Sequence, residues 1–536
     1  MSTMTRQAGP TLSAVPQERR RLWRDWALCL SIANLCFLRV WASAPPYLTR
    51  EAEAFLPELH HRVHYISLVL NEALLATAIL IWLRWTASDH VLIKRVGRCV
   101  GSGFLLAISG YAVESLLFLH AASVMPLPQL PASIRLSLCM FAVVGAAAAL
   151  VYNKLRPRVA LILRSLALMM FLPALLNICA AGWMLVRSDR SNWANSPGSA
   201  LDKKSASRRR VLFLLFDEWD DRLTFKERDK SLMLPQFDAF RREAVYASQV
   251  TQPGPHTAVS IPAIITGQAV DDTIIDGPKY FLIKTHTGTH QWQKMDNVFQ
   301  DARRLGVNVA IVGWYIPYCR LFGESTAACW NAPGGLSFRG ISMIEKGFLD
   351  DFTDQLRQVS EIGDFSPFGA PRAARERSEI VKTLGESLSA AKRAAADESY
   401  GFVYLHLPET HWPYYYDRRT GTFGPKNNTA DGYLSALALA DKALGEIREA
   451  MQQSLVWDET TIVLTSDHQV RDKALGGNGN GHVPVLIHMP GQKDQITFDK
   501  PIRTPFLKDL ITGVLDGSVT SAGDVLRVMS DRSGAK

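Results

Sequence analysis

The chain has 536 residues, which is enough for two or more domains, and its formal net charge is +8. Basic clusters beside apolar segments explain part of this charge. The sequence has no zinc-finger spacing and no aromatic–basic RNA-binding motif, so the charge does not indicate a nucleic-acid-binding protein. The apolar residues are unevenly spread along the chain, which argues against a purely soluble protein.

Five apolar runs lie in the first part of the chain. They span residues 26–42, 65–83, 101–124, 136–152 and 159–186, and each is close to the roughly 20 residues that a helix needs to cross hydrocarbon. A single run of this kind fits a cleaved signal peptide, but five spaced runs do not. The sequence therefore predicts a transmembrane domain of five helices over residues 1–186.

The charges between these runs predict their orientation. Basic clusters precede the first run (QERRRLWR), separate the second from the third (KRVGR) and separate the fourth from the fifth (NKLRPR), whereas the other two loops carry none. Because positively charged loops stay in the cytoplasm, we expect a cytoplasmic N-terminus. Everything after about residue 187 is then extracytoplasmic.

Two acidic residues, Glu72 and Glu114, lie within the apolar runs. An acid in a bilayer costs several kcal/mol unless it is paired, so acids at such positions are candidates for function. Our hypothesis is that both face a cleft for a lipid headgroup and bind substrate there. The alternative is that they lie close enough to an interface to reach water.

The cysteines agree with this topology. Only Cys319 and Cys329 belong to the outer part of the chain, and the other five lie in or beside the apolar runs: Cys29, Cys36, Cys99, Cys139 and Cys179. An oxidising compartment permits a disulfide between Cys319 and Cys329, although two unpaired thiols are the alternative. Residues 187–209 are polar and rich in serine, which predicts a linker.

From residue 210 onward, expected strands alternate with expected helices. Apolar runs predict strands at 210–216, 307–313, 400–407, 460–465 and 482–490, and helical patterns cover 235–245, 297–306, 377–397 and 431–453. Such alternation predicts an α/β domain over residues 210–536, with helices on both faces of a central, mostly parallel sheet.

Acids and histidines cluster where these strands end. They are Asp217 and Glu218 after the first strand, His406, Glu409 and His411 around the end of the strand at 400–407, Asp467 and His468 after the strand at 460–465, and His482 before the last strand. Catalytic groups of α/β sheets gather beyond the carboxyl ends of the strands, and carboxylates with imidazoles suit a divalent metal such as Zn²⁺. His286 and His290 have a metal-like spacing, but their polar surroundings favour a solvated loop.

The motifs in this order resemble the alkaline phosphatase/sulfatase superfamily over residues 210–495. VLFLLFDE is similar to its opening strand with a metal-binding acid, TAVSIPAIITG to its nucleophile turn, TSDH to a metal motif and GHVPVLI to its closing histidine strand. The cysteine that becomes formylglycine in sulfatases falls on Thr257 here, and the arginine four residues later is Ile261. A formylglycine sulfatase is therefore not expected.

The chain more closely resembles membrane-anchored phosphoethanolamine transferases and their relative lipoteichoic acid synthase, through its five apolar runs, its length and its TAVSIP turn. The resemblance implies that Thr257 is the nucleophile and also a metal ligand. It implies further ligands in Asp467, His468 and either Asp217 or Glu218, and places His411 and His482 at the headgroup or leaving group. Zn²⁺ is the expected metal, with Mn²⁺, Mg²⁺ and Ca²⁺ as alternatives.

The resemblance implies a multi-pass protein of the bacterial inner membrane with a periplasmic catalytic domain. It would move a phospho-headgroup from a membrane phospholipid to an envelope glycan or lipid through a phosphothreonine. A membrane-anchored phosphodiesterase or sulfatase-like hydrolase, with water as the acceptor, is the alternative, and a degenerate, non-catalytic relative is a third. The transferases' GET is DEW here and their cysteines flanking the turn are absent, which leaves the headgroup open.

Overall fold

A computed structural model gives the fold of the chain, which divides into two compact units. The first unit comprises residues 1–49, 58–190 and 345–371, and the second comprises residues 50–57, 191–344 and 372–536. The structure describes residues 14–43, 58–86, 161, 164, 165, 167–187, 200, 201, 209–276, 280–332, 347–360, 372–475 and 479–533. This division differs from the predicted boundary because residues 345–371 group with the N-terminal helices.

The first unit is helical. Its described helices are α1 (Ala14–Cys36), α2 (Leu38–Ser43), α4 (Glu58–Thr86), α8 (Phe171–Arg187) and α13 (Phe348–Ser360). Among the described residues, one helical stretch, Arg62–Trp85, is long and apolar enough to cross a membrane, and the helix Ala167–Trp183 is apolar but shorter. The predicted runs at 101–124 and 136–152 lie outside the described residues, so the five-helix domain stays a prediction.

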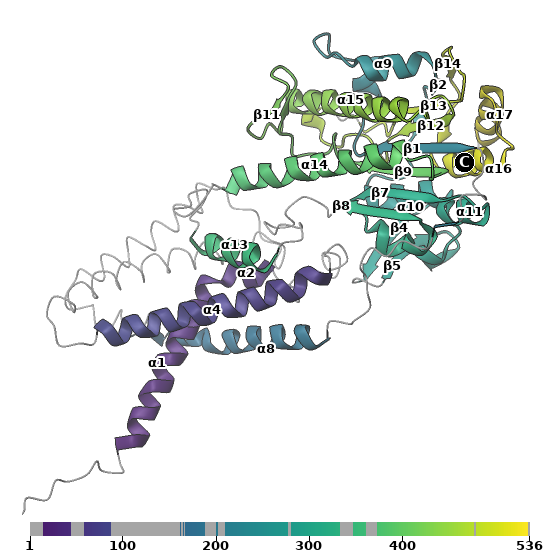
Figure 1. Cartoon of the computed structure of the whole chain (residues 1–536). Coiled ribbons are helices and arrows are strands. Elements are labelled where there is room, and N and C mark those ends of the chain that lie inside the picture. The colour runs from purple at the N-terminus through teal and green to yellow at the C-terminus, as the bar shows by residue number, and fades with distance from the viewer. Residues whose placement is uncertain are drawn as a thin grey trace, which may run out of the picture. The chain divides into compact units, whose positions relative to one another are not determined.

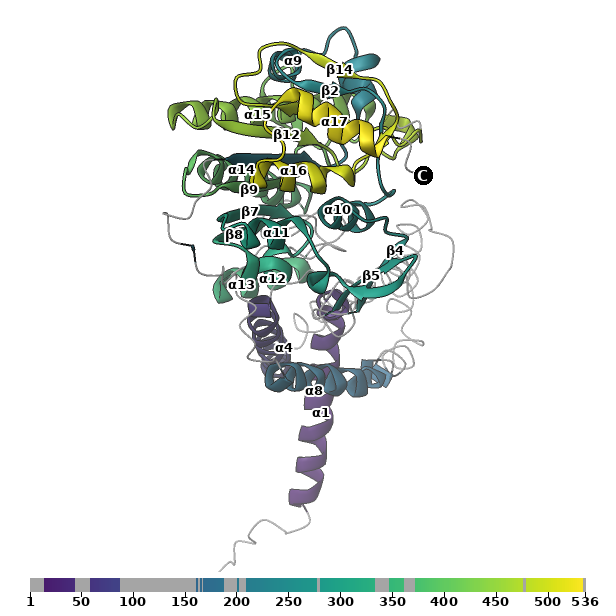
Figure 2. The same cartoon turned by 90° about the vertical axis from the view of Figure 1, so that its right-hand side faces the viewer.

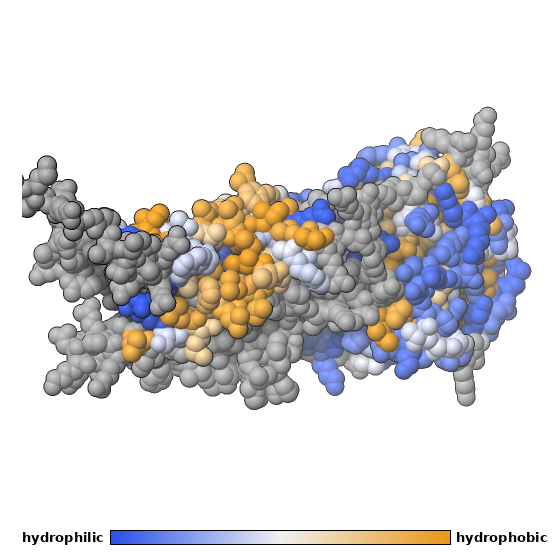
Figure 3. Space-filling view, turned by 90° about the horizontal axis from the view of Figure 1, so that it is seen from below, coloured by the Kyte–Doolittle hydropathy of each residue, from blue (hydrophilic) through white to orange (hydrophobic). Residues whose placement is uncertain are grey.

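Apolar and polar side chains are separated in this unit. Ile66, Leu74 and Leu172 are among its exposed apolar residues. Figure 3 shows one broad hydrophobic surface and another region that is largely hydrophilic. Inside the unit, Trp41 Nε1 donates a hydrogen bond of 3.0 Å to Glu72 Oε2, and Glu72 is buried. Glu114, the other intramembrane candidate, lies outside the described residues.

The second unit is built on an eight-stranded sheet with the order β14-β2-β13-β12-β1-β9-β7-β8 (Figure 1). Its strands are β1 (Arg210–Phe216), β2 (Val245–Ala247), β7 (Val309–Trp314), β8 (Ala328–Ala332), β9 (Phe402–Leu407), β12 (Thr460–Thr465), β13 (Val485–His488) and β14 (Ile496–Phe498). The five from β12 to β8 pair in parallel, while β13 is antiparallel to both of its neighbours. The predicted mostly parallel α/β domain is confirmed.

Helices cover both faces of this sheet because its central strands are buried on both sides. One face, with Val211, Phe213 and Leu215 of β1, packs with α10 (Thr257–Thr266), α11 (Val298–Arg304), α16 (Phe506–Asp516) and α17 (Ala522–Arg532). The other face, with Leu212 and Leu214, packs with α9 (Pro235–Arg242), α14 (Arg372–Ala396) and α15 (Ala430–Gln453). Figure 2 shows α10, α11, α16 and α17 together on the side nearer the viewer.

Smaller elements complete the unit. A three-stranded antiparallel sheet joins β4 (Asp272–Asp276), β5 (Tyr280–Thr285) and β6 (Gly288–Gln291). His290 belongs to β6, so the loop expected around it is a β-hairpin, in which its Nε2 lies 3.1 Å from Thr287 Oγ1. Cys319 in α12 (Tyr318–Phe322) and Cys329 in β8 form a disulfide, the bridge permitted by the sequence.

Candidate active site

Three parallel strands bring the candidate residues to one edge of the sheet. In the register of the sheet, Leu215 of β1 lies opposite both Thr465 of β12 and His406 of β9. Asp217 and Asp467 each follow the end of their strand by one or two residues, so their carboxylates meet at the carboxyl edge. This is where the strand-end rule places a catalytic centre.

Asp217, His406 and Asp467 form a fully buried group whose ligand atoms all lie within 4.8 Å of one another. The atoms Asp217 Oδ1, His406 Nε2 and Asp467 Oδ2 have no hydrogen-bond partner among the described residues. Buried polar atoms are normally paired, because leaving them unpaired costs free energy. The orphaned atoms and the mixture of carboxylate and imidazole fit a divalent cation such as Zn²⁺.

A contact at Nδ1 fixes the orientation of the His406 ring. Its Nδ1 lies 2.8 Å from the hydroxyl of Tyr318, which in turn lies 3.0 Å from the hydroxyl of Tyr404. Its Nε2 faces Asp217 Oδ2 at 3.6 Å. A partner on one ring nitrogen that orients the other toward a metal is a common arrangement in metal sites.

Thr257 is the first residue of α10, after the extended residue His256. The turn before it is tight, since a Cβ on Gly254 would lie 2.5 Å from Val259 Cγ1, and the Ser260 hydroxyl donates a 2.9 Å hydrogen bond to the Gly254 carbonyl. Ile261, Ile264 and neighbouring apolar residues anchor the helix in the core. The apolar end of the segment therefore holds Thr257 at the edge of the site.

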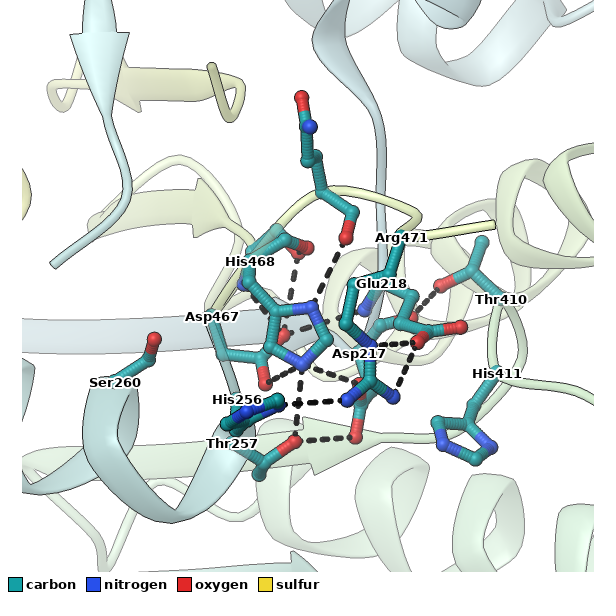
Figure 4. A network of polar contacts seen from close by, with 12 residues as sticks. Asp217, Glu218, His256, Thr257, Ser260, Thr410, His411, Asp467, His468 and Arg471 are labelled. Carbon is teal, nitrogen blue, oxygen red and sulfur yellow. Dashed lines mark hydrogen bonds and ion pairs between the residues drawn. The ribbon is translucent and has the colours of Figure 1, made fainter. Parts of the chain in front are cut away.

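The hydroxyl of Thr257 points into the polar group (Figure 4). Its Oγ1 lies 3.4 Å from Asp217 Oδ2 and 3.3 Å from His468 Nε2, and that Nε2 lies 3.2 Å from Asp467 Oδ2. His468 Nδ1 lies 3.0 Å from the carbonyl of Gln469, which can only accept a hydrogen bond. In the neutral ring, Nε2 thus carries the lone pair and faces the hydroxyl and the carboxylates.

Glu218, the rival of Asp217, has its carboxylate directed elsewhere. Arg471 donates to Glu218 Oε1 from Nε at 3.0 Å and from Nη2 at 2.7 Å, and Arg471 Nη1 lies 2.9 Å from His256 Nδ1 (Figure 4). The backbone of Glu218 is left-handed, with φ of 62°, and its N–H donates to Asp467 Oδ1 at 3.2 Å. A non-glycine residue in this conformation is strained by about 1–3 kcal/mol, and such strain clusters at functional sites.

Burial and nearby charges together shift the pKa values of the site. Burial raises the pKa of Asp467, and the nearby Asp217 carboxylate raises it further. Burial also acts to raise the pKa of Asp217, but His411, His406 and His468 together hold it well below its ordinary value. The pKa of His468 is lowered by burial and raised by Asp467 and Asp217, with a net increase.

The other two predicted histidines, His411 and His482, differ in their contacts. His411 is half-buried, its ring is tilted against that of Trp314 with 4.8 Å between centroids, and it acts to lower the pKa of Asp217. His482 instead forms a β-bridge with Thr251, and its pKa is lowered by burial and by Lys226. The backbone N–H of His482 donates a 3.0 Å hydrogen bond to Asn480 Oδ1.

Two residues of the site were missed by sequence reasoning. His406 was noted near the end of its strand but was not assigned to the metal, and the available signal was a histidine inside an otherwise apolar strand. Arg471 carries no local signal, because its partner Glu218 is 253 residues away in the sequence.

Comparison with known proteins agrees with this geometry. The sulfatase family matches residues 209–516, which is more than half of the chain. No curated protein sequence matches it.

Three solved structures illustrate the structural similarity. Ps i-CgsB aligns at 16% identity and a TM-score of 0.40 over 60% of this chain and 74% of its own. A phosphonate monoester hydrolase of Agrobacterium radiobacter aligns at 15% identity and a TM-score of 0.37, over 57% of this chain and 74% of its own. The lipoteichoic acid synthase LtaP from Listeria monocytogenes aligns at 12% identity and a TM-score of 0.36, over 64% of this chain and 81% of its own.

These TM-scores are low, so the family follows from the match over residues 209–516 and not from the three structures. With that match and a buried Asp217–His406–Asp467 group at the sheet edge, the chain belongs to the sulfatase family, within the alkaline phosphatase/sulfatase superfamily.

Proposed function

We propose that this enzyme transfers a phospho-headgroup, such as phosphoethanolamine, from a membrane phospholipid to a glycan or lipid of the bacterial cell envelope. The observation that carries the proposal is the position of Thr257, whose hydroxyl faces Asp217 and His468 beside the possible metal site. A threonine hydroxyl is a weak nucleophile unless a base or metal activates it. These neighbours supply the means of activation.

In the proposed first step, Thr257 Oγ1 attacks the phosphorus of the donor and gives up its proton, for which His468 Nε2 at 3.3 Å is the nearest acceptor. The oxygen–phosphorus bond to Thr257 forms as the bond to the lipid oxygen breaks. His411 protonates that oxygen, so a lipid alcohol leaves. A hydroxyl of the acceptor then attacks the phosphorus and gives its proton to His411, the bond between phosphorus and Thr257 Oγ1 breaks, and His468 returns its proton to Thr257.

A cation held by Asp217, His406 and Asp467 would stabilise negative charge on the phosphoryl oxygens and lower the pKa of the hydroxyl. His468 Nε2 lies 3.2 Å from Asp467 Oδ2, but a lone pair that takes the proton of Thr257 does not also bind a cation. His468 is therefore the base in this proposal, and its predicted ligand role is not part of it. Glu218 serves instead as the counter-ion of Arg471, whose guanidinium lies beside His256 at the entrance to α10. An arginine there also suits the anionic phosphate of the donor.

Membrane anchorage supports a lipid donor. The stretch Arg62–Trp85 is long and apolar enough to span a bilayer, which brings a catalytic domain within reach of lipid headgroups. The predicted multi-pass topology and the periplasmic location of residues 210–536 belong to this proposal, as does an envelope acceptor.

The proposal is tested with the full chain in detergent micelles and phosphatidylethanolamine labelled in its acyl chain, from which labelled diacylglycerol is released. Thr257→Ala should lower the rate by on the order of a thousandfold, because the covalent route is lost. Thr257→Ser keeps a hydroxyl and should retain measurable turnover. Equal rates for Thr257→Ala and the native protein contradict the proposal. Without an acceptor, release should stop at one diacylglycerol per protein, and continued release identifies water as the second nucleophile.

A further inference from the structure

A second feature of the α/β unit is a pocket whose lining residues, apart from His411, have no part in the proposed chemistry. A pocket beside the metal group is lined by one carboxylate, Glu409, and by six aromatic side chains: Trp314, Trp412, Tyr414, Tyr415, Tyr416 and Phe423. Aliphatic residues of α14 and α15 close its far side. Among the described residues of its wall, Glu409 is the one acid, and none is lysine or arginine.

Glu409 is buried in this wall without a partner. It is 4 % exposed, and neither Oε1 nor Oε2 has a hydrogen-bond partner among the described residues. An ionised carboxylate out of water costs several kcal/mol unless a positive charge compensates it. The hydroxyl of Tyr414 in the same wall is likewise buried and lacks a described partner. The pocket thus offers acceptor atoms that the described protein groups leave unused.

The pocket also adjoins the reacting groups. His411 lines it, and the charge of His411 acts on Asp217. Trp314 lines it as well, and the ring of Trp314 lies 5.9 Å, between centroids, from the ring of His406. Trp412 is 45 % exposed, so the wall reaches solvent. A small group bound in the pocket therefore lies one layer of side chains from the possible metal site.

We propose that this pocket binds an alkylammonium group, with Glu409 as its counter-ion and the aromatic rings as its walls. Ring faces attract cations through their quadrupole, and aromatic cages with an acid are suited to primary or quaternary ammonium groups. The inference deepens the proposed function, because it gives the transferred phospho-headgroup or its acceptor a cationic end. The role of the pocket in catalysis rests on the proposed function, whereas the binding of a cation there does not.

Binding is measured by titration calorimetry on the full chain in detergent, without turnover, at about pH 9, where the carboxyl of Glu409 is ionised. The probes are choline chloride and 3,3-dimethylbutan-1-ol, which has the shape of choline but no charge. Choline should bind at least about tenfold more tightly, because only the cation gains from Glu409 and the rings. Equal binding of the neutral alcohol overturns the proposal and leaves an apolar pocket.

Variants separate charge from shape. Glu409→Gln should weaken choline binding at least about tenfold, and Trp412→Ala, at an exposed position, should weaken it a few-fold while the carboxylate remains. Glu459→Gln, an exposed acid outside the pocket, is the matched control and should bind as the native protein does. Unchanged affinity in both pocket variants overturns the proposal, and thermal unfolding of each variant verifies that it is folded.

Two competitors identify the source of the cation. Displacement of choline by glycerophosphoethanolamine indicates the lipid headgroup, and displacement by glucosamine indicates an amino group of the acceptor. The titration is repeated with Thr257→Ala, which should bind choline normally. If Thr257→Ala retains turnover while choline still binds, the proposed function fails and the pocket stands. If choline does not bind while turnover depends on Thr257, the pocket fails alone.

Discussion

At the scale of single residues, the site depends on side chains whose neighbours come from distant parts of the sequence. Asp217, Asp467 and His468 could be predicted because each directly follows an apolar strand. The choice between Asp217 and Glu218 could not be predicted, since it depends on the left-handed backbone of Glu218 and on Arg471. Neither feature has a local sequence pattern.

Glu409 gives a prediction about pH. Burial raises its pKa to about 8, above the usual value of about 4.3 in an unfolded chain. A carboxyl group with a raised pKa stabilises the folded state fully at low pH, and this stability is lost as the pH rises toward the folded pKa. Between pH 5 and pH 8, the native protein should lose on the order of 1 kcal/mol per pH unit relative to Glu409→Gln.

The difference is measured as unfolding midpoints of both proteins across this pH range, in buffer free of amines. Glu459→Gln, whose side chain is exposed, should follow the native protein at every pH. Parallel curves for the native protein and Glu409→Gln contradict the burial of an unpaired carboxylate.

At the scale of elements, the strands of the sheet centre were predictable and the edges were not. β1, β7, β9 and β12 are six or seven buried, mostly apolar residues long and were expected within a few residues of their bounds. β2 and β14 have three residues each, too few for a periodic pattern. The antiparallel direction of β13 depends on chain connectivity, which periodicity does not reveal.

The start of α10 provides a test of how an element positions a nucleophile. Gly254→Ala places a methyl group 2.5 Å from Val259 Cγ1, so the turn before Thr257 must shift. We expect turnover to fall at least about tenfold, because small displacements of reacting groups are costly, and stability to fall by about 1–3 kcal/mol from overpacking.

Gly385→Ala is the matched control, since no described atom outside its own stretch of helix lies within 4 Å of the added Cβ. It should leave turnover unchanged and the helix α14 intact. Native turnover in Gly254→Ala would show that the turn does not fix the position of the hydroxyl.

At the scale of the whole molecule, the chain divides into a helical unit and an α/β unit. The break between them was predicted near residue 187 from composition, but the return of residues 345–371 to the helical unit was not. α13 contacts α4 through polar groups, for instance Asn71 Nδ2 donating to Gln355 Oε1 at 3.1 Å. Local sequence patterns cannot predict a contact between two residues that lie 284 positions apart.

Metal binding should raise the free energy of unfolding of the whole protein. An ion that binds the folded state at 100 to 1,000 times its dissociation constant stabilises it by about 3–4 kcal/mol. A chelator should therefore lower the unfolding midpoint, and added Zn²⁺ should restore it. Asp217→Asn should lose this response, whereas Asp494→Asn, at an exposed position, should keep it. If the chelator leaves the unfolding midpoint of the native protein unchanged, the metal site is contradicted.

The central claim is that the hydroxyl of Thr257 carries the phosphoryl group. The most direct measurement is mass spectrometry of the full chain after brief mixing with phosphatidylethanolamine and acid quenching, followed by peptide mapping. The account predicts a phosphoethanolamine adduct on Thr257, absent from Thr257→Ala and lost when an acceptor is added. Turnover of the donor with no adduct at Thr257, or with the adduct on another residue, would contradict it.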